Sequence, residues 1–197
     1  MKSNALQGLK GSLEVICGPM FAGKSEELLR RINRFKYADI KYLIFKPKLD
    51  TRSHATAKSR DGRILDAIEV EDSTAILEYV LNLSKRNNVD AIAIDEAQFF
   101  DEQLGRITNE LANMGYLVYV AGLDLDFKAK PFPALANCMA YADHITKLKG
   151  VCVVCGAPST RTQRLINGRP ASSSTPTVMV GDSETYESRC RRCHKVK

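Results

Sequence analysis

The feature that most constrains this chain is the segment Gly18-Pro-Met-Phe-Ala-Gly-Lys-Ser25, which fits the pattern G-x-x-x-x-G-K-[ST]. The apolar run at residues 13–17 before it is typical of a buried strand, and residues 25–37 after it carry apolar side chains at helical spacing. A glycine-rich turn from a strand to a helix leaves backbone N–H groups that point the same way and can bind phosphate. The sequence therefore predicts a phosphate-binding loop.

The residue types in this loop predict a nucleotide together with a metal ion. Lys24 can reach the β- and γ-phosphates of a nucleotide, and the Ser25 hydroxyl can ligate Mg²⁺. The other residues expected around the phosphates are Gly18, Pro19, Met20, Phe21, Ala22 and Gly23. ATP and Mg²⁺ are therefore the expected cofactors of this loop.

Strands and helices alternate through the first three quarters of the chain. Further apolar runs typical of strands lie at residues 41–46, 89–95, 116–123 and 144–148. Helical spacing of apolar residues is found at residues 73–86, 101–114 and about 133–142. This alternation predicts an α/β fold of the P-loop, RecA-like kind, in which a mostly parallel sheet is covered by helices on both faces.

An acidic pair at a strand end supports a nucleotide site. The apolar residues 91–94 lead directly into Asp95 and Glu96. In phosphate-loop folds an Asp at such a strand end lies across from the Lys-Ser pair and helps to hold Mg²⁺, so Asp95 is assigned to the ion. Glu96 is the candidate general base, because a carboxylate near the acceptor can orient its hydroxyl and accept the proton.

A second pair of charged residues follows the strand at residues 41–46. Asp50 could join the water shell of the magnesium ion, and Arg52 could contact phosphate. The carboxyl ends of strands form the ligand-binding edge of such a sheet. Without further context, however, a solvated turn is the simpler interpretation of residues 50–52.

The composition changes near residue 150, beyond which Cys, Gly, Ser, Thr and Pro dominate. Residues 159–180 lose hydrophobic periodicity, and residues 171–176 are the most loop-like part. We therefore predict two domains. Residues 1–149 form the ATP-binding α/β domain, and residues 150–197 form a small zinc-binding domain that acts as a lasso.

Four of the six cysteines occur as two C-x-x-C pairs, which predict a structural zinc site. The proposed ligands are Cys152, Cys155, Cys190 and Cys193. Four thiolates leave no open position on the ion, which argues against catalytic zinc. The pairs are further apart than the roughly 15–20 residues of an ordinary zinc ribbon, so the ion would close the base of a long polar loop. His194 is an alternative ligand next to Cys193.

Composition limits the other function classes. The length of 197 residues suits one α/β domain with a small appendage. No segment has 18 consecutive apolar residues and the first ten residues lack a signal-peptide core, so we expect a cytoplasmic protein without a membrane partner. The net charge of +6 suits either nucleic acid or a polyanionic ligand such as a nucleotide. Because only residues 189–197 are densely basic, we expect no nucleic-acid partner.

The motifs and their order closely resemble the zinc-containing thymidine kinases over nearly the whole chain. The similar segments are GPMFAGKS at 18–25, DTR at 50–52, DEAQFF at 95–100, the segment 124–132 that ends in FKAKPF, and the two C-x-x-C pairs with Tyr186 between them. Each motif alone is moderately specific, whereas their order and spacing together are highly specific.

The resemblance implies an ATP-dependent phosphorylation of the 5′-hydroxyl of thymidine, with Glu96 as the base. Around ATP it implies residues 18–25 together with Asp50, Arg52, Asp95 and Gln98. Around the nucleoside it implies Met20, Phe127, Thr162, Thr177, Val178, Met179, Val180, Gly181 and Tyr186. Phe127 would pack against thymine, the backbone of residues 177–181 would hydrogen-bond the base, and Tyr186 would help to close the site.

The resemblance also implies a homotetramer and feedback inhibition by thymidine triphosphate. The residues leave two other functions open. One is a kinase of another nucleoside, such as deoxyuridine, because the residues define phosphoryl transfer better than they define the acceptor. The other is a nucleotide-gated protein whose C-terminal zinc-binding domain binds a nucleic acid.

Overall fold

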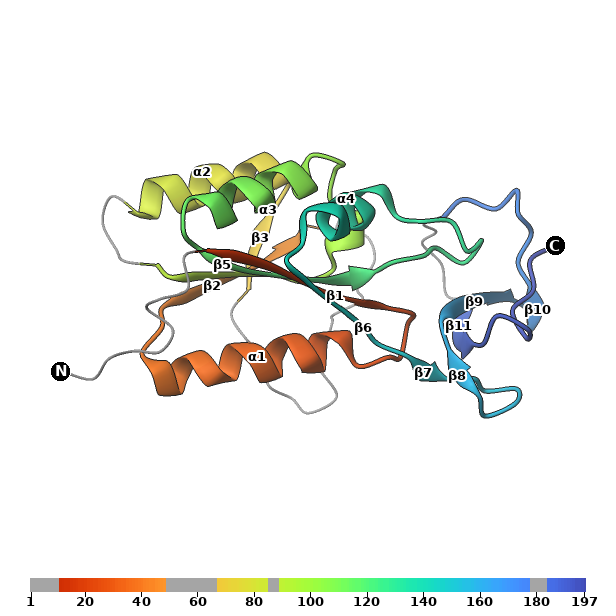
Figure 1. Cartoon of the computed structure of the whole chain (residues 1–197). Helices are drawn as coiled ribbons and strands as arrows, with labels where there is room; N and C mark the ends of the chain where they lie inside the picture. Colours follow the sequence, from red (N-terminus) through yellow and green to blue (C-terminus); the bar gives the residue numbers. More distant parts are fainter. Residues whose placement is uncertain (1–10, 49–66, 85–88, 178–183) are drawn as a thin grey trace.

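The computed structural model describes residues 11–48, 67–84, 89–177 and 184–197. Its centre is a six-stranded sheet with the order β3-β2-β4-β5-β1-β6 (Figure 1). The strands are β1 (Ser12–Gly18), β2 (Tyr42–Pro47), β3 (Ile68–Val70), β4 (Ala91–Ile94), β5 (Leu117–Leu123) and β6 (His144–Lys147). The helices are α1 (Lys24–Ala38), α2 (Ser73–Ser84), α3 (Leu104–Asn113) and α4 (Pro133–Tyr141), with a short 3-10 turn η1 (Ala97–Phe99).

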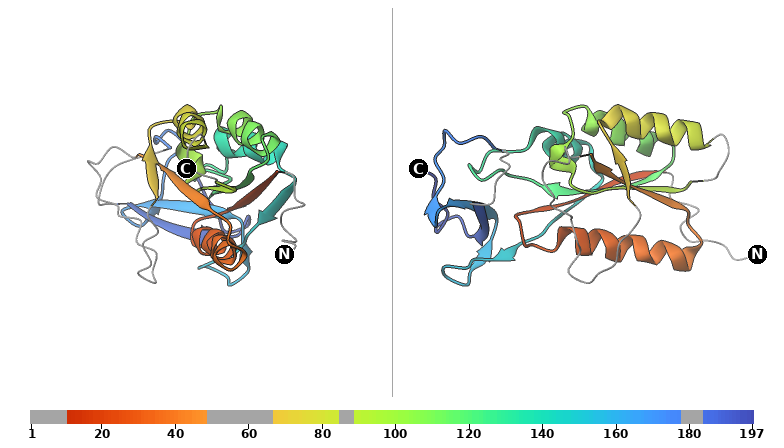
Figure 2. Two further views of the ribbon diagram at one scale, coloured as in Figure 1. Left: turned by 90° about the vertical axis from the view of Figure 1, so that its left-hand side faces the viewer. Right: turned by 180° about the vertical axis from the view of Figure 1, so that it is seen from behind.

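Every pairing between neighbouring strands of this sheet is parallel. Helix α1 covers one face, and helices α2, α3 and α4 cover the other (Figures 1 and 2). The predicted α/β fold with helices on both faces is therefore confirmed. Strand β5 separates β1 from β4, so the phosphate loop and the acidic strand end lie on the same edge of the sheet, one strand apart.

Two apolar layers fix the helices on the sheet. Leu28, Ile32 and Phe35 of α1 are buried against one face, as their helical spacing predicts. The other face buries Ile107 and Leu111 of α3 along with α2 and α4. A strand that is buried on both faces has a continuous apolar sequence. For this reason the strands at residues 91–94 and 117–123 could be predicted from the sequence.

The C-terminal part adds two small antiparallel sheets. One pairs β7 (Gly150–Val151) with β8 (Pro158–Ser159), and the other has the order β10-β9-β11. Its strands are β9 (Arg161–Ile166), β10 (Arg169–Pro170) and β11 (Glu184–Arg189). These sheets lie beyond the carboxyl ends of β1 and β5 (Figures 1 and 2). The position of a domain boundary near residue 150 stays a prediction.

Although residues 159–180 lack hydrophobic periodicity, part of this range forms the regular strand β9. This strand is buried along most of its length but is polar in sequence (RTQRLI), because its buried side chains are held by hydrogen bonds rather than by apolar contacts. Residues 171–176 do lie outside helices and strands. Within the described residues, no helix is both long and apolar enough to cross a bilayer.

Candidate phosphoryl-transfer site

The phosphate loop connects β1 to α1 through two glycines in unusual conformations. Gly18 has φ 150° and Gly23 has φ 80°, both in the range that favours glycine. A Cβ at Gly18 would lie 2.6 Å from the Leu148 carbonyl oxygen, so a side chain is excluded there. Helix α1 begins at Lys24, with a first backbone bond from Glu27 N–H to the Gly23 carbonyl at 2.9 Å. The preceding N–H groups at this helix start are available to an anion.

Lys24 lies inside the loop, among acidic neighbours. Its Nζ donates a hydrogen bond to the Pro19 carbonyl at 2.9 Å. Burial lowers the pKa of the Lys24 ammonium. The carboxylates of Glu96, Asp95 and Asp124 oppose that shift and favour the charged form. An ammonium held in this way can stabilise negative charge that develops on a phosphate.

Ser25 and Asp95 meet although they come from opposite sides of β5. Burial raises the pKa of the Asp95 carboxyl, and the adjacent charge of Glu96 raises it further. Hydrogen bonds from the Glu96 N–H, at 2.9 Å, and from Ser25 act in the opposite direction. A hydroxyl and a carboxylate at one point supply the oxygen ligands that Mg²⁺ prefers, so these residues fit the ion.

Glu96 is fixed by its backbone and by Gln98. Its φ of 52° and ψ of 38° lie in the left-handed region, which is uncommon for a residue with a side chain. The Gln98 amide donates to the Glu96 carboxylate at 2.5 Å and accepts from the Leu123 N–H at 2.9 Å. Gln98 was expected near ATP, and the structure shows that its buried side chain ties Glu96 to strand β5.

Gly122 makes room for this bridge, although no sequence motif singles it out. A Cβ at Gly122 would lie 2.8 Å from the Gln98 side-chain oxygen and 3.2 Å from the Ala97 Cβ. A side chain at position 122 would therefore collide with the Gln98 oxygen where it accepts the hydrogen bond from the Leu123 N–H.

Replacing Gly122 by Ala is expected to displace Gln98 and to destabilise the fold by about 1–3 kcal/mol through overpacking. We expect kcat to fall more than the free energy of unfolding alone explains, because Glu96 loses its partner. Urea unfolding and steady-state kinetics of Gly122→Ala and of Gly115→Ala test this. Gly115 is the control for the loss of a glycine, because no atom lies within 4 Å of its Cβ position, although its φ of 101° is also strained in Ala. Equal losses of stability and activity in the two variants would argue against the bridge.

Asp124 is an acidic residue of this site that sequence reasoning did not select. It follows β5 directly, as Asp95 follows β4, and its residue is 6% exposed. Lys147 Nζ forms an ion pair with it at 2.7 Å, but no described residue gives either carboxylate oxygen a hydrogen bond of good geometry. The signal that identified Asp95, a carboxylate at the end of a buried strand, would also have identified Asp124.

The loop after β5 carries Phe127, whose ring is predicted to pack against thymine. Asp126 accepts hydrogen bonds from the N–H groups of Lys128 and Lys130, both at 2.8 Å, which closes the loop. Phe127 at its tip is 3% exposed, and its carbonyl accepts a hydrogen bond from the His194 ring at 2.8 Å. His194 therefore supports this loop and is not part of the cysteine cluster among the described residues.

Several residues predicted for the nucleoside side do come together. The Thr162 hydroxyl accepts a hydrogen bond from the Met20 N–H at 3.0 Å, which joins β9 to the phosphate loop. Thr177 donates to Asp126 at 3.4 Å, and Tyr186 lies on β11 next to β9. The remaining predicted residues lie outside the described part of the chain: Asp50, Arg52, Val178, Met179, Val180 and Gly181.

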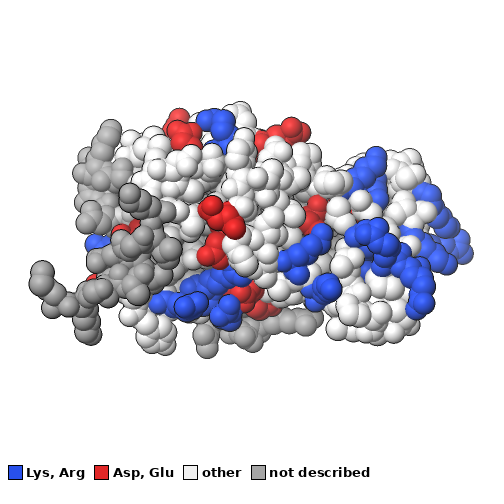
Figure 3. Space-filling model, in the orientation of Figure 1, with Lys and Arg blue, Asp and Glu red and all other residues white. Residues whose placement is uncertain are grey.

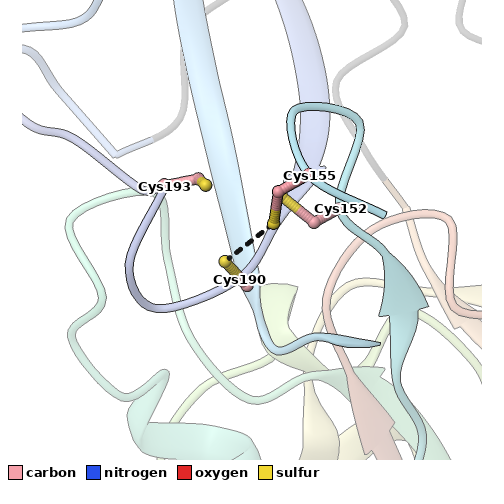
Figure 4. A group of neighbouring side chains, drawn as sticks. All are labelled: Cys152, Cys155, Cys190 and Cys193. Atoms are coloured by element: carbon pink, nitrogen blue, oxygen red, sulfur yellow. Dashed lines mark hydrogen bonds between the residues drawn. The ribbon is translucent and has the colours of Figure 1, made fainter. Parts of the chain in front are cut away.

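The four cysteines of the C-x-x-C pairs form one cluster. Figure 4 shows their side chains turned toward one another, two from the turn after β7 and two from the segment after β11. Their sulfur atoms all lie within 4.8 Å of one another, and Cys155 Sγ is 3.7 Å from Cys190 Sγ. In a tetrahedron with Zn–S bonds of ~2.3 Å, neighbouring sulfurs are about 3.8 Å apart. The cluster is therefore compatible with zinc.

Hydrogen bonds lower the pKa of the Cys152 and Cys190 thiols, whereas the hydrogen bond with Cys190 and those with the other sulfurs raise the pKa of Cys193. Backbone N–H groups lower the pKa of the Cys152 thiol to about 6, with the hydrogen bond from Cys190 as the largest cause. Since the thiolate is the form that binds a metal, this shift prepares Cys152 as a ligand. None of the four cysteines is in a disulfide.

Comparisons with known proteins agree with this architecture. A family model described as thymidine kinase matches residues 11–194. A thymidine kinase of Ureaplasma urealyticum serovar 10 (strain ATCC 33699 / Western) is 46% identical over 195 residues, which cover 99% of this chain and 87% of the relative. A thymidine kinase of Ureaplasma parvum serovar 3 (strain ATCC 700970) has the same identity and coverage.

Fold and site define a phosphate-loop α/β protein with a C-terminal four-cysteine cluster. The family model covers nearly all of the chain, and relatives with 46% identity cover it almost completely. The chain belongs to the thymidine kinase family and is an enzyme of that class, as its motifs predicted.

Proposed function

We propose that this enzyme transfers the γ-phosphoryl group of ATP to the 5′-hydroxyl of thymidine, giving thymidine monophosphate and ADP. The observation that carries the proposal is the meeting of Lys24, Ser25 and Asp95 next to Glu96 at one edge of the sheet. The names of the relatives support thymidine as the acceptor.

Residues from several segments of the chain would bind ATP, the phosphate donor. The loop residues 18–25 would surround the ATP phosphates, and Arg52 and Gln98 are proposed to contribute to the same site. Ser25, Asp50 and Asp95 would hold Mg²⁺ directly or through water, and the bound ion supplies charge neutralisation on the phosphates. Lys24 would stabilise the charge on the transferred group.

Glu96 would orient the 5′-hydroxyl and accept its proton late in the transfer. Its carboxylate is held by Gln98, so one oxygen has a fixed direction. Phosphoryl transfer needs mostly positioning and charge stabilisation from a protein, which suits a carboxylate of fixed orientation.

The nucleoside would lie between the phosphate loop and the small antiparallel sheet. Phe127 would pack against thymine, Met20 and Thr162 would border the pocket, and Tyr186 would help to close it. The backbone of residues 177–181 would hydrogen-bond the base, which rejects bases with other donors and acceptors at roughly 1–3 kcal/mol for each unmatched group.

We also propose that the four cysteines hold structural zinc and that residues 150–197 close over the bound nucleoside. Closure would keep water away from the phosphoryl group. On the family resemblance we propose a homotetramer and inhibition by thymidine triphosphate, whose base would occupy the nucleoside pocket.

The deciding experiment is ATP-dependent phosphorylation of a panel of nucleosides that includes thymidine, deoxyuridine, deoxycytidine and deoxyadenosine. We expect thymidine to give the highest kcat/KM. Success on another nucleoside without thymidine would change the acceptor and keep the mechanism, whereas failure on the whole panel would overturn the proposal.

Nucleic-acid binding is the second candidate, because Lys and Arg side chains gather over the C-terminal part of the molecule (Figure 3). Phosphate neutralisation would make such binding steeply salt-dependent. A titration of labelled single- and double-stranded DNA at several salt concentrations separates the two functions. We expect no binding at moderate salt.

Replacing Lys24 by Ala is expected to lower kcat/KM for ATP by roughly 10²-fold, because one charged donor to the phosphates is lost. Steady-state kinetics against ATP measure this effect. Lys41→Ala serves as the control, since Lys41 is an exposed lysine just before β2, far along the chain from the loop. Kinetics of Lys24→Ala equal to those of the wild type would contradict the assignment of the phosphate loop.

A further inference from the structure

Arg164 is a fully buried charged side chain to which phosphoryl transfer assigns no role. It lies in the middle of β9, and its exposed fraction is 0%. Arginine keeps its charge in proteins, so the buried guanidinium must be stabilised by its surroundings. The groups that surround it therefore indicate what it does.

Its contacts with described residues join three separate parts of the chain. The guanidinium carbon lies 4.8 Å from the ring centre of Phe127 and 5.5 Å from that of Tyr186. Nη1 donates a hydrogen bond to the Pro176 carbonyl at 2.6 Å. The contacts thus reach the loop after β5, strand β11 and the residue just before Thr177.

Strand β9 holds Arg164 in a fixed place. Thr162, two residues before it and on the same face of the strand, is bonded to the phosphate loop through Met20. Gln163, on the opposite face, exchanges two hydrogen bonds with the backbone of Lys195, both at 2.8 Å. Since β9 is anchored on both faces, the guanidinium has a defined position relative to the two rings.

We propose that Arg164 is the positioning residue of the nucleoside pocket. By stacking on Phe127 and Tyr186 and holding the Pro176 carbonyl, it fixes the aromatic surface that would contact the base. It therefore determines nucleoside affinity and base selectivity, with little effect on ATP. This inference rests on the proposed nucleoside site.

The geometry requires the planar group of arginine. A guanidinium can stack on two aromatic rings and donate in a fixed direction at the same time, which a lysine ammonium cannot do. Arg164→Lys therefore keeps the charge and loses the stacking, whereas Arg164→Met loses both. The exposed Arg169 on the neighbouring strand β10 gives the matched control Arg169→Met.

Calorimetry measures the dissociation constants of thymidine and ATP separately for these variants. We expect the thymidine constant to rise at least about tenfold in both Arg164 variants and the ATP constant to change by less than about twofold. The preference for thymidine over deoxycytidine in kcat/KM should also fall. Arg169→Met should match the wild type in all three measurements.

A purely structural role would give a different pattern. If both Arg164 variants bind nucleoside as the wild type does, or if thymidine and ATP affinities fall together, the proposal is wrong. If Arg164→Met does not fold, a double-mutant cycle of Arg164→Lys with Phe127→Leu decides. Additive losses of nucleoside affinity in that cycle would overturn the proposal, and strong non-additivity would support it.

The wild type separates this test from that of the proposed function. A wild-type enzyme that prefers another nucleoside corrects the acceptor, and the variants are then compared on that nucleoside. A wild-type enzyme that binds no nucleoside overturns both proposals.

Discussion

Replacing Glu96 by Gln is expected to lower kcat about 10³-fold and to leave the dissociation constants of ATP and thymidine within about threefold of the wild type. The amide keeps the shape and the contact with Gln98 but cannot accept the proton of the 5′-hydroxyl, and general-base catalysis contributes roughly 10²–10⁴-fold. Single-turnover kinetics measure the chemical step, and calorimetry measures binding of both substrates.

The control for this variant is Glu102→Gln, which removes the charge of an exposed carboxylate a few residues along the chain. It should retain the kcat of the wild type. A turnover number for Glu96→Gln within about threefold of the wild type would show that Glu96 is not the base. A large rise in both dissociation constants with unchanged kcat would make it a binding residue.

The strand, loop and helix around residues 18–25 and the acidic end of β4 were predicted from the sequence because their signals are local. The phosphate loop is a contiguous motif, and the strand before it and the helix after it have their own periodicity. Asp95 was found because the four residues of β4 are all buried and therefore form an apolar run with an abrupt end. Each of these features needs only neighbouring residues to be recognised.

The parts that escaped prediction depend on contacts between distant residues. Strand β9 has no hydrophobic alternation, because Thr162, Gln163 and Arg164 are each buried against a partner elsewhere in the chain. Strand β3 has three residues, too few to show a period. Only the folded arrangement shows that these segments belong to sheets.

Gly122 and Asp124 illustrate two different reasons for a missed residue. Gly122 matters because the Gln98 side-chain oxygen lies too close to leave room for a Cβ, and this contact between distant residues has no signature in the sequence. Asp124, like Asp95, is a carboxylate at the end of a buried strand. It was not selected because it also begins the segment 124–132, which was assigned to the nucleoside side. Its position between Lys24 and Lys147 places a buried negative charge beside the phosphate loop.

Removal of zinc is expected to unfold the small antiparallel sheets and to abolish phosphorylation of thymidine. The proposed ion joins the turn between β7 and β8 to the segment after β11, and the described core near it is mostly polar. Small metal-bound units without a large apolar core derive folding free energy from the ion, with apparent values of about 10–16 kcal/mol in zinc-finger peptides. The His194 contact with Phe127 would be lost with the fold of that segment.

Cys155→Ser and Cys190→Ser test this without a chelator, and Cys138→Ala is the control because Cys138 is a buried cysteine of helix α4 outside the cluster. Native mass spectrometry should find one zinc per chain in the wild type and the control, and less in both serine variants. Hydrogen exchange should accelerate in β9 and β11 and stay slow in β1, β4 and β5, which would also test the boundary near residue 150. Full thymidine kinase activity in a zinc-free variant would contradict a structural ion, and accelerated exchange across the whole chain would contradict two separate domains.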